Sequence, residues 1–230
     1  MALYAISDLH LSTFTDKPMD IFEGWQDYIP RILSNWDTAV KDDDIIVIPG
    51  DLSWAINFDE AESDFRFLDD LKGKKILLKG NHDLWYSTAT KTANWLKEKG
   101  FSSISMLNNN SYSYGDYAIA GTRGWILDRD SEDDMKVYNR EIHRLEASLD
   151  DAISRNPKEI IVFLHYPPVY SNYEHSKIVE ILIEYGIKRC YYGHVHGSSI
   201  PYAINGVKYG IEFKLISADY LQFRPLLVVK

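Results

Sequence analysis

The sequence predicts an α/β fold in which two mixed β-sheets form a sandwich flanked by helices. Short apolar runs alternate with helical patterns through roughly the first two-thirds of the chain, which is typical of βα units and parallel strands. Two segments instead place turn residues between short strand-like runs, which favours antiparallel hairpins. Two sheets packed face to face, with helices outside, accommodate both kinds of pairing. We therefore expect a four-layer α/β/β/α arrangement.

The regular elements follow from the spacing of apolar residues. Strands are predicted at Leu3–Ser7, Ile45–Pro49, Lys75–Leu78, Tyr117–Ala120, Ile160–Leu164 and Arg189–Tyr192. Apolar residues recur at helical spacing in Ala61–Leu71 and Tyr138–Ile153, which predicts helices there. Thr88–Lys99 and His175–Tyr185 are each followed by glycine, a common residue after the end of a helix.

The hairpins are predicted from turn residues. Met106–Gly121 contains tyrosine-rich runs separated by asparagine and glycine. Ile200–Ile216 carries Asn205-Gly206 between two β-type runs, which predicts a two-residue turn at that dipeptide. Phe223–Val229 is a further strand candidate. The chain has 45% hydrophobic residues, enough for a packed core, and no linker-like stretch, so we expect one domain over residues 1–230.

Composition also limits the classes of function. The net charge of −9 argues against a general basic surface for duplex nucleic acid or anionic membranes. No apolar run approaches the length of a membrane span. The N-terminus lacks a basic region and reaches Asp8 too early for a signal peptide, which predicts a soluble, cytoplasmic protein. Cys190 is the single cysteine, and we expect a buried thiol.

Five apolar runs end in side chains that can bind a metal. The residues that follow these runs are Asp8 and His10, then Asp51, then Asn81, His82 and Asp83, then His165, and finally His194 and His196. Sites in open α/β sheets gather outside the carboxyl ends of strands, where all five groups lie. Residues two apart on a strand share a side, so each Asp-x-His or His-x-His pair can bind one ion. The pattern predicts a metal cluster.

These motifs, in this order, resemble those of the calcineurin-like metallophosphoesterases. They are Asp8-x-His10, Gly50-Asp51, Gly80-Asn81-His82-Asp83, His165 and Gly193-His194-x-His196. The resemblance covers about the first 196 residues and implies a two-sheet sandwich with a binuclear metal centre. It assigns Asp8, His10 and His196 to one metal and Asn81, His165 and His194 to the other, with Asp51 bridging. His82 would face the substrate, and Asp83 would orient it.

The resemblance also implies a reaction. A hydroxide between two divalent metals would attack phosphorus, while protonated His82 stabilises the developing charge and protonates the leaving oxygen. Imidazole-rich ligation favours transition metals over magnesium, with manganese preferred and iron, zinc or cobalt as alternatives. We expect a small phosphomonoester or phosphodiester as substrate, since the chain shows no accessory domain for a protein partner. Its oligomeric state stays open.

Several assignments have two interpretations. Trp54, Trp85 and Trp125 each follow a presumed site loop, where they could stack on a substrate ring or pack the loop against the core. Arg123 could hold a phosphate oxygen or be an ordinary surface arginine. The whole chain could also be a non-catalytic scaffold or a nucleotide sensor with the same fold. Retention of His82 favours an enzyme over a scaffold.

Overall fold

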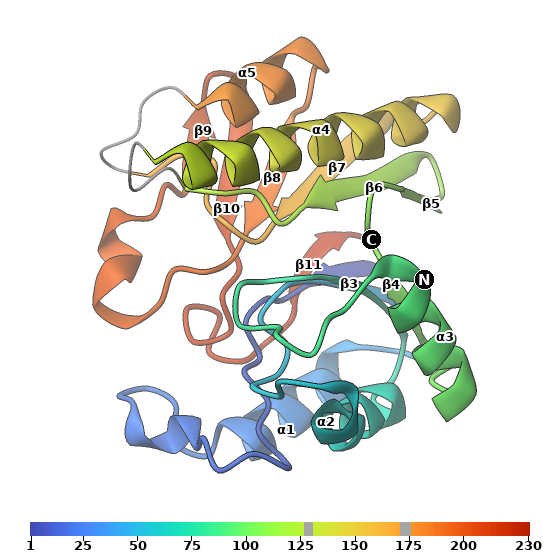
Figure 1. The fold of residues 1–230 in the computed structure, drawn as a ribbon, viewed down its shortest axis with the longest axis vertical. Coiled ribbons are helices and arrows are strands. Elements are labelled where there is room, and N and C mark those ends of the chain that lie inside the picture. The colour runs from blue at the N-terminus through green and yellow to red at the C-terminus, as the bar shows by residue number, and fades with distance from the viewer. Residues whose placement is uncertain (127–130, 171–175) are drawn as a thin grey trace. The chain divides into compact units, whose positions relative to one another are not determined.

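The computed structural model describes residues 1–126, 131–170 and 176–230 (Figure 1). The chain forms two compact units. The first contains Met1–Met106 and Ile216–Lys230, and the second contains Leu107–Leu215. Each unit has one mixed sheet with its own helices, as predicted for the fold class.

The first unit is built on a five-stranded sheet of order β11-β1-β2-β3-β4. Its strands are β1 (Leu3–Ala5), β2 (Ile45–Pro49), β3 (Lys74–Leu78), β4 (Ile104–Met106) and β11 (Leu226–Val229). The strands β1 to β4 are parallel, and β11 pairs with β1 in the antiparallel sense. Because β1, β2 and β3 run in the same direction, the loops after them leave from the same edge of the sheet.

Helices of the first unit cover one face of this sheet. They are α1 (Tyr28–Ala39), α2 (Phe58–Asp70) and α3 (Ala89–Lys99), with a short 3-10 helix, η1 (Met19–Ile21), before them. The Asn57 and Thr88 side chains cap α2 and α3, and Gly100 ends α3 with φ of 74°. The core joins Trp36 of α1 and Phe65 of α2 to strand residues of the sheet, and α1 and α2 lie on the same side of it in Figure 1.

The second unit is built on a six-stranded sheet of order β5-β6-β7-β8-β10-β9. Its strands are β5 (Tyr112–Tyr114), β6 (Tyr117–Thr122), β7 (Glu159–Leu164), β8 (Arg189–Tyr192), β9 (Gly206–Lys208) and β10 (Ile211–Leu215). The four central strands are parallel, and the edge strands β5 and β9 are antiparallel to their neighbours.

Two helices cover this second sheet on the same face (Figure 1). They are α4 (Glu132–Ser154) and α5 (Lys177–Glu184), and the short 3-10 helix η2 (Gly197–Tyr202) follows β8. Close approach of strands requires glycine at Gly121, where a Cβ atom would lie 1.9 Å from the Phe163 carbonyl oxygen. The buried Ser148 hydroxyl of α4 accepts the Gly121 N–H at 2.9 Å and thereby attaches the helix to β6. Cys190 is buried in β8, as predicted.

One turn prediction is wrong. The hairpin between β9 and β10 turns at Tyr209-Gly210, both with positive φ (55° and 76°), and not at Asn205-Gly206. Gly206 instead pairs with Phe213 in the ladder, and the Asn205 side chain accepts the Leu215 N–H at 3.0 Å. The turn that matches the twist of the strands requires two left-handed residues, and tyrosine-glycine adopts that conformation here.

Within residues 1–126, 131–170 and 176–230, no helix combines the length and the apolar character needed to cross a membrane.

Candidate functional site

The loop after β1 carries Asp8 and His10 in a bent backbone. Both residues have positive φ, 61° and 46°, a region in which Asp and His are less disfavoured than most residues. The Asp8 N–H donates to the Gly50 carbonyl and the His10 N–H donates to the Asp51 carbonyl, each at 3.0 Å. These bonds hold the loop after β1 beside the loop after β2.

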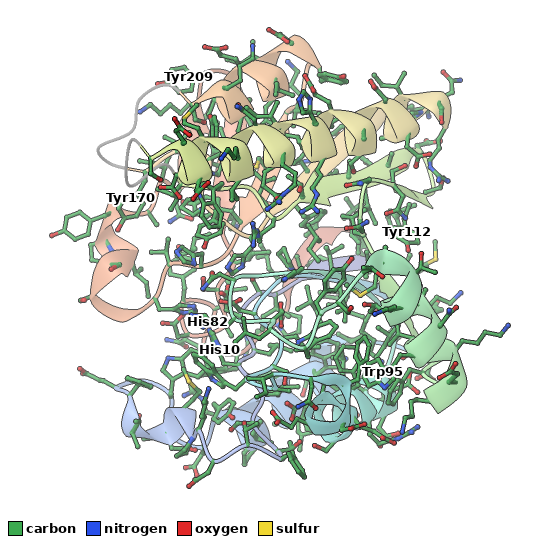
Figure 2. All side chains as sticks on the ribbon, viewed as in Figure 1. His10, His82, Trp95, Tyr112, Tyr170 and Tyr209 are labelled. Carbon is green, nitrogen blue, oxygen red and sulfur yellow. The ribbon has the colours of Figure 1, made fainter. Side chains whose placement is uncertain are left out.

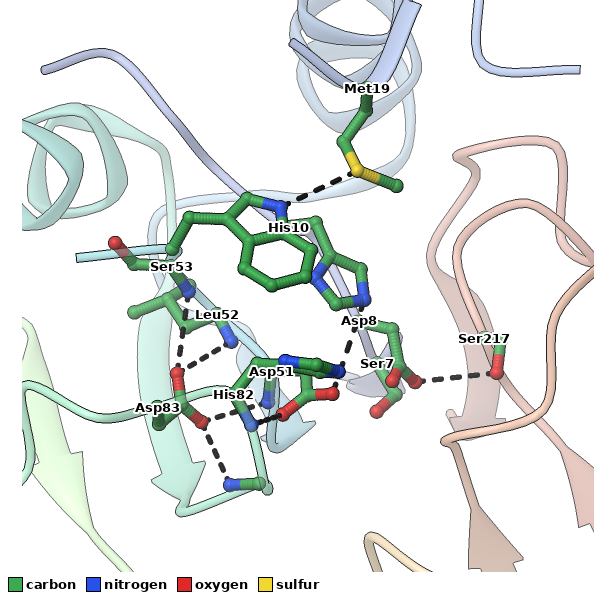
Figure 3. Close-up of polar contacts among 12 residues, drawn as sticks. Ser7, Asp8, His10, Met19, Asp51, Leu52, Ser53, His82, Asp83 and Ser217 are labelled. Carbon is green, nitrogen blue, oxygen red and sulfur yellow. Dashed lines mark hydrogen bonds and ion pairs between the residues drawn. The ribbon is translucent and has the colours of Figure 1, made fainter. Parts of the chain in front are cut away.

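Asp51 connects the loops after β1, β2 and β3. Its Oδ1 accepts the His82 backbone N–H at 2.8 Å, and its Oδ2 lies 4.0 Å from His10 Nε2 (Figure 3). Asp8 Oδ2 accepts the Ser217 hydroxyl at 3.3 Å. The first unit therefore brings Asp8, His10, Asp51 and His82 together.

This donor set fits a divalent cation. Asp8 and Asp51 are buried, with 0% and 1% of their surface exposed. A buried carboxylate is costly unless its charge is compensated, and a metal ion provides that compensation. Carboxylate oxygens and an imidazole are also the donors that transition metals accept. Asn81, the other predicted ligand of this unit, lies between Gly80 and His82 in the loop after β3.

Gly80 allows that loop to approach Asp51. A Cβ atom at position 80 would lie 2.1 Å from Asp51 Oδ1 and 2.4 Å from the Asp51 nitrogen. No side chain can occupy that space without moving the carboxylate. Gly80 is therefore needed for packing at the site.

Asp83, which the motif resemblance predicts to orient His82, makes its hydrogen bonds to other groups. The buried Asp83 carboxylate accepts five N–H groups, and Figure 3 shows the bonds from the backbone amides. They are the backbone amides of Gly80 and residues 51–53, at 2.8 to 3.3 Å, and the Trp85 indole, at 2.9 Å. Burial raises the pKa of the Asp83 carboxyl, and the hydrogen bonds from Gly80 and Trp85 oppose this increase. Asp83 thus joins the loops after β2 and β3.

Trp54 packs against two histidines of the site. Its ring stacks on His10 with centroids 4.9 Å apart and lies 4.5 Å from the His82 ring. Its indole N–H donates to the Met19 sulfur at 3.4 Å. The two histidine rings are 5.6 Å apart, and Figure 2 shows them together in the first unit. Trp54 therefore restricts how both imidazoles can turn.

Trp85 packs the loop after β3 against the core. Trp85 is only 2% exposed, its N–H is bound to Asp83, and its ring packs edge-on against Phe65 of α2. Of the two interpretations of this residue, packing of the loop against the core is the correct one.

The second unit places its histidines at the ends of β7 and β8. The buried His165 donates its N–H to the Arg123 carbonyl at 3.1 Å, and its own carbonyl accepts the Gly193 N–H at 3.1 Å. His194 has φ of 70°, and its ring lies 5.1 Å from that of His165. The unit therefore brings His165 and His194 together, as their positions after neighbouring strands predict.

Arg123 and Trp125 form part of a polar network at the end of β6. Arg123 is 15% exposed and is not a surface arginine, since its Nη2 lies 3.5 Å from the buried Glu141 carboxylate. Its guanidinium lies over the Trp125 ring at 4.8 Å. The Trp125 indole donates to Asp134 at 3.2 Å. Both side chains therefore have packing roles, whatever contact they make with substrate.

A cavity of about 350 Å³ adjoins the histidines that follow β8. It is lined by Ile126, Pro167, Tyr170, His194, Val195, His196 and Ser199. Sequence reasoning missed most of the uncharged residues in this lining, because they are ordinary loop residues with no motif. It also missed Ser217, which reaches Asp8 from a position 209 residues later in the chain.

Comparisons with known proteins identify a family. Residues 1–198 match the model of the calcineurin-like phosphoesterases. An uncharacterized protein of Methanocaldococcus jannaschii is 29% identical over 86 residues, which is 35% of this chain and 46% of that protein. The match thus spans about half the length of that relative.

Solved structures are similar over nearly the whole chain. A phosphopantetheinyl hydrolase from Mycobacterium tuberculosis gives a TM-score of 0.54 at 14% identity, covering 99% of this chain and 96% of that one. A protein of unknown function from Aquifex aeolicus gives 0.51 at 20% identity, covering 98% and 94%. At these identities the likeness shows the fold.

Proposed function

The chain belongs to the calcineurin-like phosphoesterase family of metal-dependent phosphoester hydrolases, and on this premise we propose a binuclear enzyme that hydrolyses small phosphomonoesters or phosphodiesters. The observation that carries the proposal is the group of buried Asp8, His10 and Asp51, which three hydrogen-bonded loops hold beside His82. A catalytic metal site needs ligands that are fixed before substrate binds, and the packing of these side chains supports the proposal.

The proposed ligand sets come from the family motifs. Asp8, His10 and His196 would hold one ion, and Asn81, His165 and His194 the other, with Asp51 shared by both. We propose manganese, with iron, zinc or cobalt as alternatives, because imidazole-rich sites suit these ions. When bound, two divalent ions would polarise the phosphoryl oxygens and supply hydroxide near neutral pH.

His82 would act as the proton donor to the leaving oxygen. Its backbone is fixed by Asp51, and its ring is packed against Trp54. A positively charged imidazole next to the reacting group would stabilise the charge that develops as the ester bond breaks. Trp54 would keep that ring at one orientation toward the substrate.

A small substrate is supported by the cavity beside His194 and His196. Its volume of about 350 Å³ suits a small organic group, and Ile126, Val195 and Tyr170 give it an apolar and aromatic lining. Among the described residues of that lining, the Tyr170 phenol is the only ionisable group besides the histidines. We propose that the uncharged organic part of the ester binds there.

The test is hydrolysis by the purified protein with added manganese. We expect turnover of p-nitrophenyl phosphate or bis-p-nitrophenyl phosphate, and the ratio of the two rates ranks monoesterase against diesterase. The alternative, a scaffold or a sensor that binds nucleotide without turnover, predicts no product with either compound across several metals.

Asp51→Asn is the decisive variant for the ligand assignment. Loss of a bridging charge should lower the occupancy of both metals, measured by elemental analysis, together with the rate. Asp42→Asn, at an exposed position, is the matched control and should leave both quantities unchanged. Two metals per chain and the full rate in Asp51→Asn would refute the shared-ligand role.

A further inference from the structure

A second cavity, of about 510 Å³, lies in the first unit between α1 and the turn that precedes β11. It is lined by Pro30, Arg31, Ser34, Asn35, Leu221, Gln222 and Arg224. Arg31 and Arg224 thus both line this cavity, and its lining contains no carboxylate among the residues that the structure describes. In a chain with a net charge of −9, such a locally positive cavity favours an anionic ligand.

Arg31 is held in place on one wall. Its Nη1 donates to the Gly24 carbonyl at 2.7 Å and to the Gln26 carbonyl at 3.4 Å. Its guanidinium also lies over the Phe223 ring, 4.4 Å from the centroid. These contacts use part of the guanidinium, and its remaining N–H groups make no hydrogen bond to any residue that the structure describes.

Arg224 lies on the opposite wall. Its backbone N–H donates to the Leu221 carbonyl at 3.1 Å, while its exposed guanidinium makes no ion pair or hydrogen bond within the described part of the chain. The turn is fixed in an uncommon conformation, since Gln222 and Phe223 both have positive φ and Phe223 is buried. The Asn35 side chain donates to the Gln222 carbonyl at 3.1 Å and so connects the two walls.

We infer that this cavity binds a phosphorylated small molecule, with the phosphate held by Arg31 and Arg224. A planar guanidinium donates two parallel N–H groups to phosphate oxygens, which makes arginine pairs effective phosphate sites. The volume is in the range of small-molecule sites and exceeds what the phosphate alone needs. Ser34, Asn35 and Gln222 offer uncharged polar groups to the remainder of the ligand. None of the lining residues of this cavity is a proposed metal ligand, so the inference is independent of the proposed function.

The test is a titration of metal-free protein, in EDTA, followed by ¹H–¹⁵N NMR. The probes are orthophosphate and glucose 6-phosphate, with glucose and sodium chloride at matched ionic strength as controls. We expect saturable shifts of the Ser34, Asn35 and Gln222 amides with either phosphate probe only. The same titration of Asp51→Asn should give the same result, which separates this cavity from the metal ligands.

Arg224→Ala should weaken binding about tenfold or more, the effect of losing a charge-assisted hydrogen bond. It removes a side chain without bonds to described residues, so the fold should persist. Arg31→Lys keeps the positive charge but removes the planar guanidinium and its parallel N–H donors, so it should also weaken binding. Arg140→Ala, at an exposed position on α4, is the control and should bind normally. Shifts equal to those with sodium chloride, or unchanged binding by Arg224→Ala, would overturn the inference.

Discussion

At the scale of single residues, His82 and Asp83 are neighbours with different surroundings. The His82 ring lies against the rings of Trp54 and His10, among groups that could meet a substrate. The Asp83 carboxylate is buried and bound to the backbone of two loops. The first therefore belongs to the proposed chemistry, and the second to the framework that positions it.

His82→Ala tests the chemical role. We expect metal content and thermal stability close to those of the parent protein, with the turnover rate reduced on the order of 10²–10⁴-fold, as for loss of a general acid. Elemental analysis and steady-state kinetics on p-nitrophenyl phosphate measure the two quantities. An unchanged rate would show that another group protonates the leaving oxygen.

Asp83→Asn tests the framework role. An amide side chain has one acceptor oxygen in place of two, so the buried N–H groups of Gly80 and residues 51–53 would lose partners. We expect the free energy of unfolding to fall by about 2–3 kcal/mol, the cost of charge-assisted bonds lost in the interior. Urea unfolding measures it, with Asp42→Asn as the control. Parent-like stability would contradict this role.

At the scale of elements, the buried Lys75 of β3 connects α2 to β4. Its ammonium donates to the Asp69 and Leu71 carbonyls at the end of α2 and to the Ser103 hydroxyl. A positive charge at the C-terminus of a helix interacts favourably with the helix dipole. Burial nevertheless lowers the pKa of Lys75 to about 8, and Asp69 and Asp70 oppose the decrease.

This pKa predicts a pH dependence of stability. Between about pH 8 and 10.5 the unfolded chain keeps the Lys75 proton while the folded protein loses it, so stability should rise with pH. Relative to Lys75→Met, the free energy of unfolding of the parent protein should rise by up to about 3 kcal/mol across this range. Urea unfolding at both ends of the range measures the difference. Lys74→Met, at the exposed neighbouring position, should show no such change.

At the scale of the whole molecule, metal binding and folding should be linked. A ligand that binds only the folded state raises its stability by RT ln(1 + [L]/Kd). The buried carboxylates of Asp8 and Asp51 are costly to the folded state unless a cation compensates their charge. We expect EDTA to lower the melting temperature and manganese to restore it, with a smaller response in Asp51→Asn. Differential scanning fluorimetry measures the shifts, and equal melting temperatures with and without EDTA would contradict the linkage.

The sequence by itself determined the class of fold and the family, because both are encoded locally. Strands and helices follow from apolar spacing over a few residues, and each predicted ligand stands directly after an apolar run, as Asp51 does after β2. The family match over residues 1–198 covers the part of the chain that carries these motifs. The helix α1 is absent from the predicted elements, although Ile32 and Trp36 have helical spacing.

Only the tertiary structure decided which side chains meet. The partners of Asp83 include residues 51–53, about 30 positions away, and Ser217 reaches Asp8 across almost the whole chain. Trp85, in the loop after β3, packs against Phe65 of α2, and the turn at Tyr209-Gly210 depends on the register of β9 with β10. These contacts depend on packing between distant segments, and a local pattern contains no information about the distance between them.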